Sequence, residues 1–97
     1  MLIIFENVKK FVKRIGDIVI YKWVLDKFKE IGIDKWFVDE IYKEHKRIYL
    51  NDDRFTPEEM LIIAYHDCKC FNITNSDMFE VIDDLRECET LNDIMDI

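Results

Sequence analysis

Apolar residues recur every three or four positions along most of this chain, the spacing that places them on one face of an α-helix. Five such segments follow one another, and a short apolar turn comes last. They cover residues 2–15, residues 17–31, a stretch from 34 to the polar break at 51–53, a stretch that begins at 56, residues 75–88, and the turn at 90–95. Gly occurs twice and Pro once, too few for the many tight turns of an all-β fold. The pattern predicts an all-α fold, a small bundle of about five short amphipathic helices.

The second segment carries the most ambiguous pattern. Its β-branched run at 18–20 favours a strand. However, Val24 and Phe28 lie at helical spacing, and Gly32 supplies a helix stop. We therefore predict a helix here and keep a strand at 18–24 as the alternative.

The fourth segment has the clearest start signal. Thr56 stands at the N-cap position, Pro57 at the first helical position and Glu59 at the third, which together make a capping box. The residues that follow at the spacing of a buried helix face are Leu61, Ala64, Tyr65 and Cys68. Because 97 residues leave room for one domain, we predict a single helical domain over residues 1–97.

Charge is divided unevenly between the two halves of the chain. Residues 1–50 hold 11 Lys and Arg against 8 Asp and Glu, whereas residues 51–97 hold 3 against 13. The net charge of the whole chain is −7 at pH 7. Such asymmetry indicates either a binding surface or two halves that complement each other within the fold.

The acidic residues of segment 75–88 fall into one row on a helix. The row lies opposite the apolar residues Met78, Ile82 and Leu85. Its members are Asp77, Glu80, Asp83, Asp84 and Glu87. A row of this kind keeps a protein in solution, and it also steers encounters with basic surfaces. We predict these five as partner-binding residues for another protein with a basic surface.

The basic residues of the first half suggest an alternative function, that of a small helical nucleic-acid-binding regulator. The candidates are Lys9, Lys10, Lys13, Arg14, Lys43, Lys46 and Arg47. Acidic residues are interleaved with them, so no continuous basic stripe forms. A protein with net negative charge is also repelled by phosphate at long range, which makes nucleic acid the less favoured partner.

One cluster contains residue types that bind metals. His66 and Cys70 share a helix face at i,i+4, while Cys68 points elsewhere. Zinc requires four tetrahedral ligands, and no second pair of ligands stands near this cluster in the sequence. A Cys/His metal-binding protein is therefore the second alternative, and we predict no metal or cofactor.

No pattern in the chain points to catalysis. Gly16 and Gly32 alone cannot form a phosphate-binding loop. Carboxylates on a water-exposed helix face have nothing to raise a pKa for acid–base work. The three cysteines are an odd number, no secretory signal is apparent, and no apolar run reaches the roughly 20 residues of a membrane span. We expect a cytoplasmic protein with reduced thiols that does not cross a membrane.

The sequence as a whole predicts a non-enzymatic protein–protein interaction module. In its sharpest form, this would be a phage or mobile-element inhibitor that mimics nucleic acid by presenting carboxylates in place of phosphates. Exposure of one or two aromatic residues would mark a partner surface. The aromatic residues considered are Trp23, Trp36, Phe37, Tyr42 and Tyr49. A homodimer is compatible with this prediction, because a thin core can leave apolar surface to cover.

Overall fold

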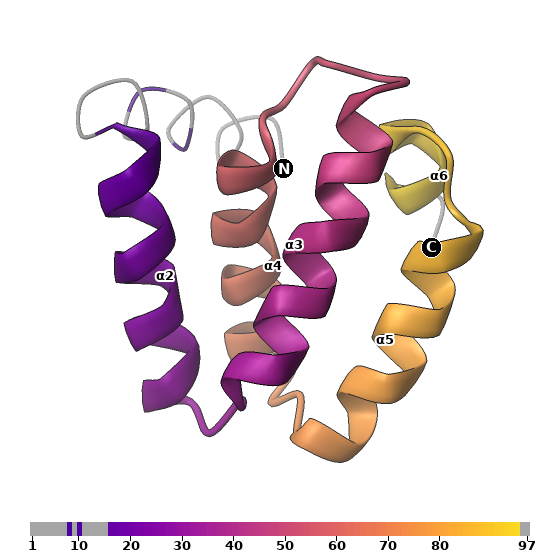
Figure 1. Ribbon diagram of the computed structural model, residues 1–97. Helices are drawn as coiled ribbons and strands as arrows, with labels where there is room; N and C mark the ends of the chain where they lie inside the picture. The colour runs from indigo at the N-terminus through magenta and orange to yellow at the C-terminus, as the bar shows by residue number, and fades with distance from the viewer. Residues whose placement is uncertain (1–7, 9, 11–15, 96–97) are drawn as a thin grey trace.

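The computed structural model describes residues 8, 10 and 16–95, and within them it contains five helices and no strand. The helices are α2 (Asp17–Glu30), α3 (Lys35–Tyr49), α4 (Pro57–Cys70), α5 (Asn75–Glu87) and α6 (Leu91–Met95). The prediction of an all-α bundle is confirmed (Figure 1). The helix predicted over 2–15 lies outside the described residues, apart from Val8 and Lys10.

Residues 18–24 are helical, so the strand alternative is wrong. The β-branched run is overridden by burial, because Ile20, Val24 and Phe28 are all fully buried on one helix face. A strand would have placed the exposed Lys22 on that same buried face. The helix begins after Gly16, whose φ of 95° is a left-handed conformation that suits glycine.

The same kind of turn joins α2 to α3 and α4 to α5. In each, a left-handed residue follows the helix, Gly32 with φ 82° and Asn72 with φ 52°. The next residue, Ile33 or Ile73, donates its backbone N–H at 2.9 Å to the carbonyl five residues earlier. Gly32 was predicted as a helix stop, and Asn72 does the same because asparagine tolerates this backbone region.

Capping boxes start both α4 and α5. The backbone N–H of Thr56 donates to the Glu59 carboxylate at 2.8 Å, and that of Glu59 donates to the Thr56 hydroxyl at 3.2 Å. Thr74 and Asp77 form the same arrangement before α5. The first box was predicted from the sequence. Each box orients its helix by satisfying backbone donors at the N-terminus.

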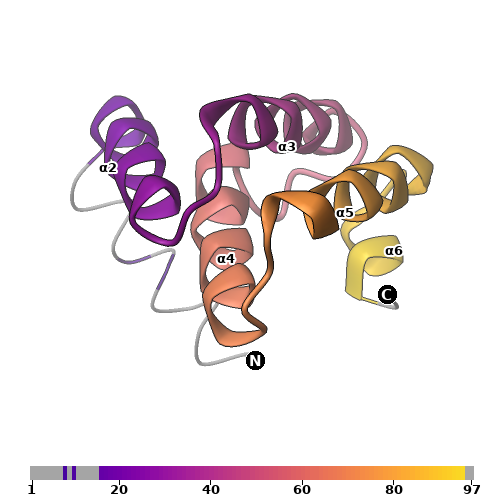
Figure 2. The same ribbon diagram turned by 90° about the horizontal axis from the view of Figure 1, so that it is seen from below.

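The central helix of the bundle is α3. It packs against α2, α4 and α5, and α2 also packs against α4. In contrast, α4 and α5 follow each other in the chain but do not pack closely together, as Figure 2 shows. The residues predicted to face inward from α5, Met78, Ile82 and Leu85, are buried. None of the helices in the described part of the chain is long and apolar enough to cross a membrane.

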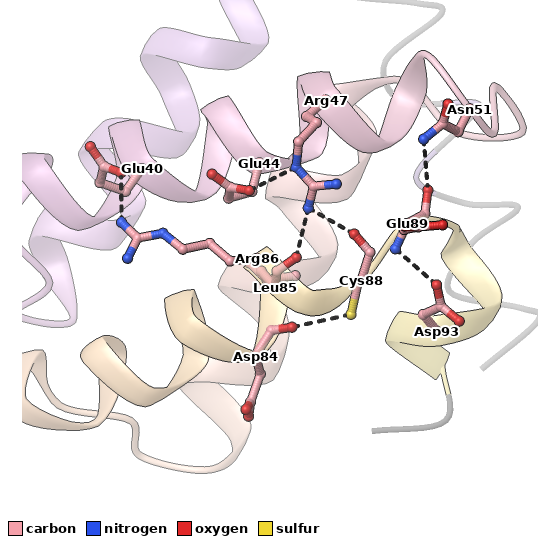
Figure 3. A network of polar contacts seen from close by, with 10 residues as sticks. All are labelled: Glu40, Glu44, Arg47, Asn51, Asp84, Leu85, Arg86, Cys88, Glu89 and Asp93. Carbon is pink, nitrogen blue, oxygen red and sulfur yellow. Dashed lines mark hydrogen bonds and ion pairs between the residues drawn. The ribbon is translucent and has the colours of Figure 1, made fainter.

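Arg47 fastens the C-terminal end of α5 to α3 (Figure 3). Its Nη2 donates to the carbonyl oxygen of Leu85 at 2.9 Å and to that of Cys88 at 2.7 Å. Its Nε donates to the carboxylate of Glu44 at 2.9 Å, and the Glu44 side chain is only 8% exposed. A cation at this end of a helix also complements the helix dipole. Arg47 therefore holds the C-terminal end of α5 against α3.

Candidate interaction surface

Most of the predicted acidic row faces solvent. Glu80, Asp83 and Glu87 are exposed, whereas Asp84 is partly buried on the flank toward α4. Neither Glu80 nor Glu87 forms an ion pair within the described residues. These carboxylates are free to meet a partner's cations.

Asp77 is exposed but takes part in the fold of α5. Its Oδ2 accepts from the backbone N–H of Thr74 at 2.9 Å and from the hydroxyl of Thr74 at 3.0 Å. These hydrogen bonds favour the ionised form and lower the pKa of Asp77. Replacing Asp77 would thus weaken the helix start as well as any contact with a partner.

Asp83 shares a weak ion pair with Arg86. One guanidinium nitrogen of Arg86 lies 3.4 Å from Asp83, and the other lies 3.4 Å from Glu40 on α3. Exposed pairs of this kind contribute only about 0–1 kcal/mol. Asp83 can therefore exchange Arg86 for a cation of a partner at little cost.

An exposed aromatic pair borders the acidic row. Phe79 on α5 is 57% exposed and Trp36 on α3 is 53% exposed, and their ring centroids are 6.0 Å apart. The buried ring of Phe37 packs edge-on against both, with centroid distances of 5.0 Å. Since Asp83 follows Phe79 at i,i+4, the carboxylate and the ring lie on the same side of α5. Large rings beside charged groups are typical of protein-binding surfaces.

We call this surface the acidic–aromatic face. It consists of Trp36, Phe79, Glu80, Asp83 and Glu87. Trp36 was among the aromatic residues considered from the sequence, whereas Phe79 was missed. The available signal was that Phe79 lies one position off the apolar stripe of α5.

The basic candidates for nucleic-acid binding do not form one surface among the described residues. Lys10, Lys43 and Lys46 are exposed, but Arg47 is engaged with the end of α5. Lys9, Lys13 and Arg14 lie outside the described residues.

The Cys/His cluster has the arrangement that its helical spacing predicts. His66 and Cys70 are exposed with Nε2 and Sγ 3.6 Å apart, whereas Cys68 is buried against Met78. Burial raises the pKa of Cys68 to about 11, so its thiol packs as a protonated, apolar group. The described residues contain no group of three or more His, Cys, Asp or Glu that could hold a metal ion.

No known family matches the chain: comparison with protein-family models, with curated proteins and with solved structures finds no match. The function must therefore be inferred from the surface itself. The acidic–aromatic face is the candidate, because it joins exposed rings from α3 and α5 to three exposed carboxylates, of which Asp83 alone is ion-paired among the described residues.

Proposed function

We propose that this protein is a non-enzymatic interaction module that binds another protein through the acidic–aromatic face. The observation that carries the proposal is the exposed ring of Phe79, which contacts Trp36 and shares its side of α5 with Asp83. Aromatic anchors contribute much of the affinity at protein interfaces. Exposed apolar rings that lie together beside polar residues mark interaction sites.

The negative charge of the acidic–aromatic face favours a partner with a positively charged surface. The half of the chain that contains α5 holds 13 acidic against 3 basic residues, so its field attracts a basic surface over several ångströms. Carboxylates around an aromatic anchor speed association and exclude acidic competitors. The partner we propose is a protein with a basic surface and a shallow apolar site that accepts the rings.

The sharpest form of the proposal is a nucleic-acid mimic. A basic surface that normally holds phosphates would meet carboxylates instead, and the protein would act as an inhibitor of nucleic-acid binding. We place this action in the cytoplasm, since the three cysteines are free thiols, and we assign it to a phage or mobile element. In this form, DNA and the protein compete for one partner.

Neutralising the face tests the proposal. We expect the triple variant E80Q/D83N/E87Q to bind the partner at least about tenfold more weakly, because it removes three carboxylates that pair with cations of the partner. The partner is first captured from a host-cell lysate with the wild type and identified by mass spectrometry. Its affinity for each purified variant is then measured by calorimetry. F79A should weaken binding by a similar factor through loss of the anchor.

The matched control removes the same charge elsewhere. D26N/D34N/D53N changes three exposed acidic residues outside the face, and it should bind like the wild type. Equal affinity of both triple variants would refute a charge-driven interface. If DNA fails to compete with the protein for the captured partner, the nucleic-acid-mimic form is wrong, and a general interaction module remains.

A further inference from the structure

A groove runs between α4 and α5 on the flank of α5 that faces away from Phe79. Its floor is α3, through Ile41 and His45, and its walls include Ile63 and Val81. The cavity has a volume of about 280 Å³ and is partly open to solvent. It exists because α4 and α5 both pack on α3 without packing closely on each other (Figure 2). This volume is near the lower limit for small-molecule sites.

An unsatisfied polar side chain lies in the apolar lining. His45 is only 4% exposed, and neither Nδ1 nor Nε2 has a hydrogen-bond partner in the structure described. Burial lowers the pKa of His45 to about 4, so the imidazole is neutral at pH 7. A neutral imidazole offers one N–H donor and one acceptor nitrogen. A buried group left in this state indicates a missing hydrogen-bonding partner.

Two acidic side chains line the same groove from its opposite walls. Asp67 on α4 is exposed, and Asp84 on α5 is partly buried. Their negative charge disfavours an anion in the groove and favours a cation. The groove therefore combines an apolar middle, a neutral imidazole in the floor and two carboxyl groups nearer to solvent.

We propose that this groove binds a small organic amine with an apolar, ring-sized body. The body packs between α4 and α5, and its ammonium group lies near Asp67 and Asp84. A hydroxyl group of the ligand hydrogen-bonds to a ring nitrogen of His45; because both nitrogens are covered in the structure, the neighbouring side chains must move apart to admit it. A hydroxyl group suits a neutral imidazole because it can either donate or accept. This site is separate from the acidic–aromatic face, and its failure would leave the proposed function standing.

Four probes of similar size test the assignment with the full chain. Tyramine carries ring, hydroxyl and ammonium; phenethylamine lacks the hydroxyl; 4-ethylphenol lacks the ammonium; 4-hydroxyphenylacetate carries an anion instead. We expect tyramine to bind roughly three- to tenfold more tightly than either truncated probe, because each lost interaction is worth one net hydrogen bond or exposed ion pair. The anionic probe should show no saturable binding. Calorimetry gives the affinities, and the imidazole signals of His45 in NMR should shift with tyramine.

Two variants locate the binding groups. H45L should bind tyramine no better than phenethylamine, and D67N/D84N should bind it no better than 4-ethylphenol. D26N/D34N is the matched control, since it removes two exposed charges that do not line the groove and should leave tyramine binding unchanged. Circular dichroism checks that each variant is folded.

Equal affinity of the wild type for all four probes would overturn the proposal, because it would mean a groove without polar selectivity. No saturable binding of tyramine would overturn it as well. Loss of tyramine binding in D26N/D34N to the same extent as in D67N/D84N would also contradict it, since the charge effect would then be non-local.

Discussion

Replacing His45 with leucine is expected to stabilise the protein, and the gain should grow as the pH falls below 6.5. At neutral pH the substitution removes a buried polar group without partners and adds apolar contact, which is worth about 1–2 kcal/mol. Below that pH a second effect adds to it. The pKa of His45 falls from 6.5 to about 4 on folding, because burial disfavours the charged imidazolium.

The direction of the pH effect follows from which state binds the proton. As the pH falls from 6.5 toward 4, the unfolded chain protonates His45 and the folded chain does not, so unfolding is favoured. The wild type should lose about 3 kcal/mol over this range through His45, with full stability retained above pH 6.5. The H45L variant has no titratable group at position 45, so it does not lose this free energy of unfolding. Urea unfolding at pH values of about 7.5, 5.5 and 4.5 measures the difference.

Other titrating groups line the same cavity, and they are shared by both proteins. Burial raises the pKa of Asp67 and that of Cys68 in wild type and H45L alike, so subtracting the two curves isolates the effect of His45. H66N serves as the control, because it removes an exposed histidine and leaves the buried His45 in place. Parallel curves of stability against pH for wild type and H45L would contradict the prediction, because they would mean that folding does not lower the pKa of His45.

Replacing Arg47 with alanine is expected to lower the stability of the protein more than any other surface substitution. R47A should lower the free energy of unfolding by about 3 kcal/mol, because it leaves a buried carboxylate and two helix-end carbonyls without their donor. Glu44 is the critical group, since its side chain is only 8% exposed. Urea unfolding at neutral pH measures the change, and the double variant E44Q/R47A should recover part of the loss by removing the unpaired charge.

Arg86 provides the comparison within the same polar network (Figure 3). It is 50% exposed and its two ion pairs are each 3.4 Å long, so R86A should cost no more than about 1 kcal/mol. Comparing R47A with R86A therefore separates the contribution of an ion pair with a buried carboxylate from that of two exposed ion pairs. A loss in R47A as small as that in R86A would mean that water replaces the guanidinium at the end of α5.

Local signals explain what could be predicted of the fold. The capping box at Thr56 and the stop at Gly32 act within a few residues, so they can be recognised in the sequence alone. The choice between helix and strand at 18–24 was harder, because β-branched residues favour a strand locally. It was decided by burial of Val24 and Phe28 and by the exposure of Lys22, which only packing reveals.

The candidate site was predictable in part for the same reason. Helical spacing alone places Glu80 and Glu87 away from the core, and the structure agrees. The role of Asp77 in a capping box could have been recognised from Thr74, three residues earlier. In contrast, the position of Asp84 beside a groove depends on α4. The contact between Phe79 and Trp36 joins residues more than 40 positions apart, and no local pattern contains it.

The three cysteines, which differ in burial, make the protein unequally reactive toward alkylating reagents. Thiolates are the reactive form, and burial raises the pKa of Cys68 to about 11 and that of Cys88 above its usual value. Cys70 is exposed and stands next to Phe71, which lines the groove. A maleimide dye added near neutral pH should therefore attach at Cys70 alone, without mutagenesis. The chain thus carries its own attachment point for a fluorescent reporter, one residue from the groove and on a different helix from the acidic row.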